Sequence, residues 1–303
     1  MSGQAAVGVL VSLIQVFSTS VGLHTSDPSR DEEASAARAA FIFFGLSTLF
    51  LVFTIGAHAW LVTTPEYKAV VVPFEAKKGI IGIDEEREAL VGGGPVNRLP
   101  EKKKSRVMEV AKMNFEYNFA VAYVFIITLS VFPSITSAIR SVQLPSSPAS
   151  MHPLLFTAIH FLVFNIGDFI GRYLPSIRRL QIWSSRRHLY MALSRTLFVP
   201  LFLLCNVERP SLTTPVTKIP VINSDILFFL ILFIFGLSNG YTGSLVMMAA
   251  PSREHNFRLK HRPEDVDTAA TIAQFCLVGG LAIGSFMSFG VRGALCACNP
   301  FMS

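Results

Sequence analysis

The chain has 303 residues, of which 51% are hydrophobic and 15% are charged, whereas a soluble domain usually carries about a quarter charged residues. Together with a mean hydropathy of +0.50, this composition excludes an ordinary soluble protein and indicates an integral membrane protein. The net charge of +6 does not indicate nucleic-acid binding, because Lys and Arg fall in connections that flank apolar segments, where membrane topology explains them.

Seven stretches are long and apolar enough, at about 20 residues each, to cross a hydrocarbon core of about 30 Å as helices. Because lipid offers the backbone no hydrogen-bond partners, such segments must be helical. We therefore predict an all-α, multi-pass integral membrane protein with seven transmembrane helices. The first is interpreted as a span, since it lacks the basic start and cleavage site of a signal peptide. The stretches lie near residues 4–23, 37–63, 113–139, 153–174, 188–206, 224–249 and 268–291.

The positions of Lys and Arg predict the orientation in the membrane. The connections after the second, fourth and sixth stretches are rich in Lys and Arg. The Lys and Arg residues of the intervening connections are few, chiefly Arg30, Arg140, Arg209 and Lys218. By the positive-inside rule, the rich connections and the amino terminus face the cytosol, while the carboxyl terminus faces outward. A seven-helix receptor has the opposite orientation.

The predicted helices divide the chain into three parts. Residues 1–63 hold two transmembrane helices, residues 64–112 form a flexible basic cytosolic loop, and residues 113–303 hold a five-helix bundle. The run KKKSR at 102–106 could lie on anionic lipid and be released by phosphorylation of Ser105. A solvated topology determinant with no regulatory role is the alternative.

A charged pair inside the fourth stretch is the most informative feature of the sequence. Asp168 and Arg172 lie one helical turn apart, and Phe161 and Asn165 share their helical face. A charge near the bilayer centre costs about 2.5–3.5 kcal/mol, so such residues usually face a polar cavity or each other. An Arg can hold adjacent hydroxyls while an Asp fixes its rotamer, which favours a polyhydroxylated or aromatic solute. The alternatives are an ion pair that locks two helices together, or an Arg172 that snorkels to the cytosolic side.

Other polar residues in apolar stretches give weaker indications. Asn239, beside Gly240, and Gln274 are candidate contacts of a polar cavity, although Gln274, like Gln15, could simply bridge neighbouring helices. Arg195 could contact solute, snorkel or hydrogen-bond a neighbouring helix. His58 and His160 could relay protons, but a lone histidine in a bundle is more often hydrogen-bonded and inert.

Small residues repeat every fourth position in the last two stretches. Such ridges allow helices to pack closely, and they would also permit one bundle to rock against another. The ridges consist of Gly236, Gly240 and Ser244, and of Gly280, Gly284 and Ser288.

The sequence contains no arrangement typical of an enzyme or a metal site. The four cysteines follow no disulfide or zinc spacing, and no nucleophile with a base or phosphate-binding glycine loop occurs at usable spacing. We therefore predict no enzymatic activity, no cofactor and no metal.

Several runs of the chain resemble the equilibrative nucleoside transporter family. They occur in the family's order over nearly all of the chain, from SGQAAVG at 2–8 onward. The resemblance implies facilitated movement of nucleosides, and an extension to nucleobases, through a cavity between two helical halves of a major-facilitator-like fold. It also implies that Arg172 binds ribose hydroxyls, that Asp168 holds Arg172, and that Phe161 and Asn165 lie near the site. The matching runs are VFPSIT at 131–136, FNIGDFIGRYLP at 164–175, SRTLFVPLFLLCN at 194–206, FGLSNGYTGSLVMMAAP at 235–251 and FCLVGGLAIGSFMSF at 275–289.

The resemblance also implies a departure from the family's architecture. The family has an eleven-helix fold of six plus five, and this chain begins at what resembles the fifth helix. We therefore expect an incomplete carrier that contacts membrane lipids and lacks four amino-terminal helices. The alternatives are a truncated assembly partner that does not transport, and, less favoured, a seven-helix receptor.

Overall fold

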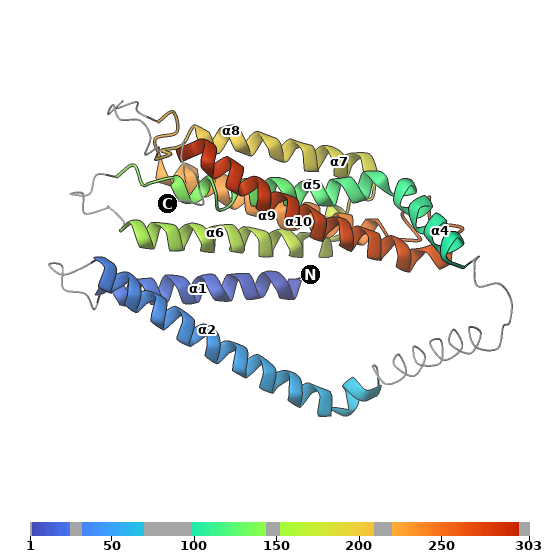
Figure 1. Ribbon diagram of the computed structural model, residues 1–303, viewed down its shortest axis with the longest axis horizontal. Coiled ribbons are helices and arrows are strands. Elements are labelled where there is room, and N and C mark those ends of the chain that lie inside the picture. Colours follow the sequence, from blue (N-terminus) through green and yellow to red (C-terminus); the bar gives the residue numbers. More distant parts are fainter. Residues whose placement is uncertain (1, 25–31, 70–98, 144–151, 209–219, 297–303) are drawn as a thin grey trace.

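The computed structural model describes residues 2–24, 32–69, 99–143, 152–208 and 220–296 (Figure 1). Within these ranges the chain is helical apart from turns and one isolated antiparallel bridge between Ile139 and Val207. This confirms the prediction of an all-α protein. The α-helices are α1 (Ser2–His24), α2 (Glu32–Thr63), α4 (Leu99–Met113), α5 (Phe115–Val131), α6 (Pro153–Tyr173), α7 (Ser185–Ser194), α8 (Phe198–Leu203), α9 (Asp225–Ala249) and α10 (Val266–Cys296).

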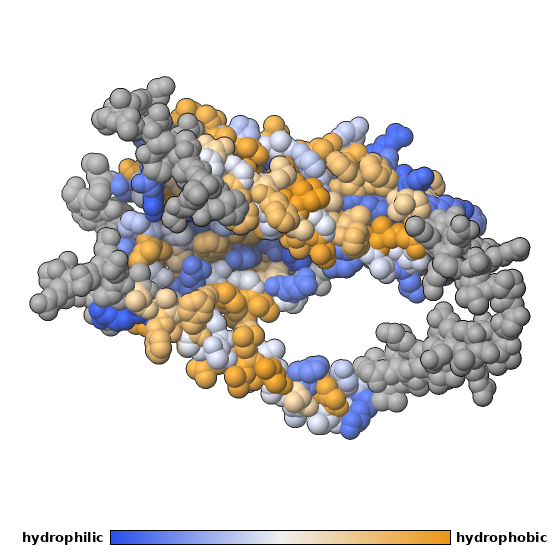
Figure 2. Space-filling model, in the orientation of Figure 1, coloured by the Kyte–Doolittle hydropathy of each residue, from blue (hydrophilic) through white to orange (hydrophobic). Residues whose placement is uncertain are grey.

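Six helical segments of the described chain are long and apolar enough to cross a membrane, which agrees with a multi-pass membrane protein. In Figure 2 hydrophobic residues cover much of the helices, and hydrophilic residues gather toward the end that contains α4. The six segments are Gly3–Leu23, Ala40–Thr63, Phe115–Ala138, Pro153–Ser176, Asp225–Ala249 and Pro263–Leu295.

The seventh expected span, at 188–206, is helical but interrupted. It consists of α7, a 3-10 turn η4 (Arg195–Leu197) and α8. Pro200 lies in the first turn of α8 and has no N–H to bond the carbonyl of Thr196 one turn earlier, so the α-helical hydrogen bonding of α7 cannot run unbroken into α8. The predicted count of seven transmembrane helices is therefore not confirmed within the described ranges. The interruption falls where the Arg195 side chain is buried.

The connection at 64–112 contains helix where the sequence analysis expected only a flexible loop. Residues 65–69 are helical, and α4 covers 99–113, so the basic run at 102–106 lies in a helix; residues 70–98 are outside the described ranges. α4 is held because its fully buried Val110 packs against Leu259 and Ala269.

Ion pairs add to this attachment of α4. Arg106 bonds Asp265 at 2.6 Å, and Arg262 bonds Glu109 at 2.6 Å. The hydrogen bond from Arg262 to Glu109 raises the pKa of the Arg262 guanidinium above its usual value. Because these pairs join α4 to the turn before α10, the residues next to the membrane-spanning bundle form a fixed charged end.

The bundle is built from paired helices (Figure 1). α6 packs on α9, α5 packs on α10, and α1 lies along α6, while α2 contacts α1 and then slants away from the bundle. Residues 51–63 of α2 are therefore exposed on the apolar outer surface. α6 lies between α1 and α9, so its polar face runs along the seam between these two helices.

Glycines bring α6 and α9 into close contact. A Cβ atom on Gly171 of α6 would meet the Leu237 carbonyl oxygen, and one on Gly240 of α9 would meet the Asp168 carbonyl oxygen. Gly167 and Gly236 make the same kind of backbone contact one turn away. The interpretation of the small-residue ridges as packing surfaces is confirmed at Gly236 and Gly240, which meet the backbone of α6, and at Gly280 and Gly284, which meet the backbone of α5. The first contact places the middle of α9 beside Asp168.

Candidate functional site

The predicted charged pair forms within α6. The Arg172 Nε donates to Asp168 Oδ2 at 2.8 Å, and the two side chains are 14% and 7% exposed, respectively. Both residues belong to one helix, so the ion pair does not itself join two helices. The second carboxylate oxygen does so, because Asp168 Oδ1 accepts a hydrogen bond from Asn239 Nδ2 of α9 at 2.7 Å.

Asn239 extends the contact from α6 toward α5 and η4. Its Oδ1 lies 2.7 Å from the Thr128 hydroxyl of α5, and the Thr128 Oγ1 accepts a hydrogen bond from Arg195 Nη2 at 2.9 Å. Arg195 also donates through Nη1 to the Phe235 carbonyl oxygen at 3.0 Å. We call the connected side chains the polar network; its members are Arg172, Asp168, Asn239, Thr128 and Arg195, with Ser238 bonded to Arg195.

Arg195 has the most unusual surroundings of the network. Its side chain is 1% exposed, and its guanidinium carbon lies 4.5 Å from the centre of the Phe235 ring. Snorkelling is therefore wrong for Arg195, and hydrogen bonding to neighbouring helices is confirmed. Thr128 and Ser238 were not identified from the sequence, because a hydroxyl in an apolar helix usually bonds its own backbone.

Asn165 and Phe161 belong to the same face of α6 but contact different partners. Asn165 Nδ2 donates to Ser12 Oγ of α1 at 2.7 Å. Gly8 makes room for this contact, since a Cβ atom there would lie 2.7 Å from Asn165 Oδ1. Phe161 is half-buried and packs edge-on against Phe132, with ring centres 5.1 Å apart. The predicted face is thus divided between an α1 contact and the polar network.

The remaining polar candidates lie away from the polar network. Gln274 is exposed on α10 and contacts no member of the network within the described ranges, and His58 is exposed on α2. Gln15 of α1 is half-buried. His160 is buried, and its ring bonds the Thr136 hydroxyl at 3.1 Å and the Thr157 carbonyl oxygen at 2.8 Å. These contacts show that the His160 ring is hydrogen-bonded on both nitrogens.

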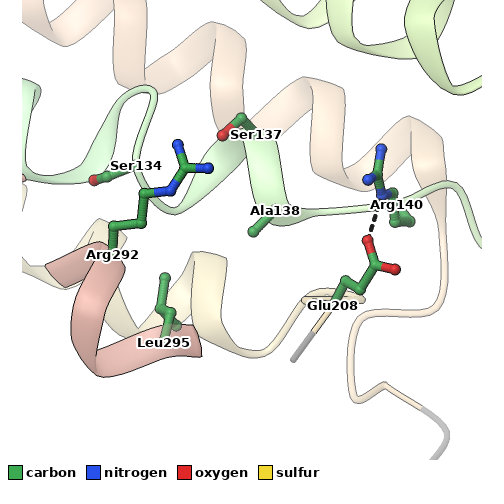
Figure 3. A pocket seen from close by; sticks show the side chains of 7 residues that line it. All are labelled: Ser134, Ser137, Ala138, Arg140, Glu208, Arg292 and Leu295. Atoms are coloured by element: carbon green, nitrogen blue, oxygen red, sulfur yellow. Dashed lines mark hydrogen bonds and ion pairs between the residues drawn. The ribbon is translucent and has the colours of Figure 1, made fainter. Parts of the chain in front are cut away.

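A cavity of about 190 Å³ lies where α5 and α10 end, apart from the polar network (Figure 3). On one side Arg140 forms an ion pair with Glu208 at 2.7 Å, and on the other the Arg292 guanidinium is directed between Ser134 and Ser137. None of the six candidate solute contacts lines this cavity.

The ion pair with Asp168 does not use the two outer nitrogens of the Arg172 guanidinium. Its Nε is occupied by Asp168, whereas Nη1 and Nη2 make no hydrogen bond within the described part of the chain. A guanidinium fork of this kind can donate to two adjacent oxygens at once. Among the described residues no group of three His, Cys, Asp or Glu side chains could hold a metal ion, and Cys205 and Cys276 are free thiols.

Comparison with known sequences identifies the family of the chain. The chain is 28% identical to equilibrative nucleoside transporter 1 of Rattus norvegicus over 300 residues, and 28% identical to the Homo sapiens protein of the same name over 303 residues. In both cases the alignment covers 96% of this chain and 61% of the relative, so the chain spans less than two thirds of their length. Equilibrative nucleoside transporter 2 of Homo sapiens is 35% identical over 167 residues, which cover 55% of this chain and 33% of the relative. The sequence model described as "Nucleoside transporter" matches residues 1–293, and the chain therefore belongs to the nucleoside transporter family.

Proposed function

We propose that this chain binds nucleosides at Arg172 and takes part in their facilitated movement across a membrane. The observation that carries this proposal is the Arg172 guanidinium, which is held within a membrane-spanning helix by Asp168 and keeps both Nη groups unbonded within the described residues. Family membership supports nucleosides as the solute, since the relatives are named for them.

The chemistry of the pair suits the sugar of a nucleoside. A ribose presents two adjacent hydroxyl oxygens, and the fork of Nη1 and Nη2 can donate to both. Because Asp168 balances the charge of Arg172, an uncharged solute can bind beside the pair without adding a charge to the membrane interior. Asn239 holds Asp168 in this arrangement, and Phe161 and Asn165, on the same face of α6, are proposed as flanking solute contacts. Gln274, which lies away from the polar network, is proposed as a solute contact at another point of the path.

We further propose that movement occurs by alternating access in a major-facilitator-like arrangement, with nucleobases as an additional solute. The contact of Gly280 and Gly284 of α10 with the backbone of α5, which involves no member of the polar network, supports the alternating-access part of this proposal, because small residues let helices approach closely with few interlocking side chains. We also propose that the amino terminus and the end that contains α4 face the cytosol, as the positive-inside rule predicts.

Uptake of labelled uridine tests the proposed binding role. The chain is reconstituted in liposomes, and initial uptake is compared with that of Arg172→Ala and Arg172→Lys. Losing hydrogen bonds to a charged group costs about 1.5–3 kcal/mol, so we expect uptake at low uridine to fall by about tenfold or more in Arg172→Ala. Arg172→Lys keeps the charge but not the fork, so it should restore only part of the uptake.

Arg140→Ala is the matched control, because Arg140 forms an exposed ion pair with Glu208 outside the polar network. Its uptake should stay within about twofold of the parent protein. Undiminished uptake by Arg172→Ala would contradict the assigned role of Arg172. A parent chain that neither binds nor moves uridine would contradict nucleoside transport by this chain and favour a non-transporting assembly partner.

A further inference from the structure

The hydrogen bonds of the polar network have a fixed direction. Arg195 can only donate, and the Asp168 carboxylate can only accept. Because Arg195 Nη2 donates to Thr128 Oγ1, the single hydroxyl proton of Thr128 must point away from Arg195. The acceptors in reach are Asn239 Oδ1 at 2.7 Å and the Val124 carbonyl oxygen at 2.6 Å. With its oxygen toward Thr128, Asn239 presents its NH₂ group to Asp168.

Burial prevents water from replacing these bonds. Thr128 and Asp168 are each 5% exposed, and Asn239 is 4% exposed. A buried polar group that loses its partner bears the full cost of its desolvation, so each member of the chain of hydrogen bonds restricts the next. The orientation of the Asp168 carboxylate therefore depends on groups that lie on α5 and η4 as well as on α6.

Arg195 is costly to bury and has no carboxylate among its hydrogen-bond partners. Its acceptors are the Thr128 hydroxyl, the Ser238 hydroxyl and the Phe235 carbonyl oxygen, and its Nε has no partner within the described residues. A charged group inside a membrane bundle usually has a functional role, because packing alone is achieved at lower cost by an apolar side chain.

We infer that Arg195 is a positioning residue for solute binding: through Thr128 and Asn239 it fixes the Asp168 carboxylate, which in turn directs the free Nη groups of Arg172. Arg195 itself does not touch the solute. This inference rests on the proposed function, because it assigns Arg195 a role in the nucleoside site at Arg172. It predicts that breaking the chain of hydrogen bonds at any point affects the solute contacts that Arg172 makes.

The test compares a solute that carries both ribose hydroxyls with one that lacks them. Half-saturation concentrations for uridine and 2′,3′-dideoxyuridine are measured with the parent chain, Arg195→Met and Thr128→Val in liposomes. We expect each of the two variants to raise the half-saturation concentration for uridine by about tenfold, since the oriented hydrogen bonds to its ribose hydroxyls are lost. The half-saturation concentration for the dideoxy compound should change by less than about twofold, because this compound has no ribose 2′- and 3′-hydroxyls for Arg172 to bind. Melting temperatures are recorded for every variant.

Two further variants separate positioning from simple packing. Thr128→Ser keeps the hydroxyl and should retain nearly the parent preference for uridine. Arg258→Met removes an arginine that bonds Glu116 at 2.8 Å outside the polar network, so it should leave the preference unchanged even where it lowers the melting temperature. If Arg195→Met is too unstable to reconstitute, Thr128→Val breaks the same chain of hydrogen bonds and decides the question.

The inference would be overturned if Thr128→Val, and Arg195→Met where it reconstitutes, raised the half-saturation concentrations for uridine and the dideoxy compound equally. Arg195 would then be a helix-packing residue. An unchanged uridine affinity in Thr128→Val would overturn it as well. These outcomes differ from a failure of the proposed function, in which Arg172→Ala itself leaves uridine uptake intact.

Discussion

Asp168 uses its two carboxylate oxygens for different purposes. Oδ2 accepts from Arg172 on the same helix, and Oδ1 accepts from Asn239 on the neighbouring helix. The polar network contains two guanidinium groups and this single carboxylate, so Asp168 is the anion that keeps the buried positive charge tolerable. We therefore expect Asp168 to matter for stability as well as for binding.

Asp168→Asn should destabilise the protein strongly. It removes the charge that balances Arg172, and breaking a buried ion pair typically costs about 3–5 kcal/mol. The matched control is Glu208→Gln, which removes the same kind of charge from an ion pair whose side chains are 47% and 58% exposed. Exposed pairs contribute about 0–1 kcal/mol, so the free energy of unfolding of the control, measured in mixed micelles, should change little. Equal shifts would show that the Asp168 pair is no more important than a surface pair.

The sequence analysis singled out most members of the polar network one by one, including Asn239 and Arg195 outside α6, but it did not predict that they contact one another. Helical spacing places Asp168 and Arg172 one turn apart without any tertiary information. Thr128 could not be recognised, because its hydroxyl also bonds its own helix at Val124, as hydroxyls in apolar helices commonly do. Its contact with Asn239 depends on how α5 and α9 meet, and that relation is not encoded in local spacing.

At the scale of helices, backbone contact explains how two polar residues meet inside an apolar bundle. Where α6 crosses α9, glycines from both helices remove the side chains that would hold the backbones apart. Asn239 can then reach Asp168 with a short side chain at 2.7 Å. The glycine spacing was visible in the sequence, but the pairing of these two helices was not.

A methyl group at this crossing should disturb the site. Gly240→Ala would place a Cβ atom against the Asp168 carbonyl oxygen and the Arg172 backbone nitrogen. We expect the helices to separate, with a loss of stability of about 1–3 kcal/mol and weaker uridine binding.

Gly279→Ala is the matched control, since nothing lies within 4 Å of its added Cβ atom on α10. There the higher helix propensity of Ala should stabilise by about 0.5–1 kcal/mol. Thermal unfolding of both variants measures the difference, and a stabilised Gly240→Ala would argue against close contact of α6 and α9.

The interrupted helix at 185–203 shows where sequence patterns were less informative. Hydropathy alone predicts a continuous span, because the stretch is apolar after its first turns. The structure instead places a 3-10 turn at Arg195–Leu197, where Pro200 removes a backbone donor and the Arg195 side chain enters the bundle. Arg195, the first residue of this 3-10 turn, donates a hydrogen bond to Thr128.

Across the whole molecule, charged contacts occur at both ends of the bundle and in the polar network between them. At one end Arg106, Glu109, Arg262 and Asp265 join α4 to the turn before α10. At the other end Arg140 pairs with Glu208 beside the bridge between Ile139 and Val207. The excess of Lys and Arg in the connections on the α4 side, rather than the packing, predicts that this end faces the cytosol.

Thiol labelling tests that orientation for the whole molecule. Cys205, Cys276, Cys296 and Cys298 are first replaced by alanine, and a single cysteine is then introduced as Gln143→Cys or Glu254→Cys, two exposed positions at opposite ends of the bundle. A membrane-impermeant maleimide should label Gln143→Cys in intact cells, because the positive-inside rule places the sparsely charged connection outside. Glu254→Cys lies beside Arg253 in a basic connection, so it should react only after the membrane is permeabilised. The reverse pattern would require the basic α4 end to face outward, and the proposed cytosolic amino terminus would then be wrong.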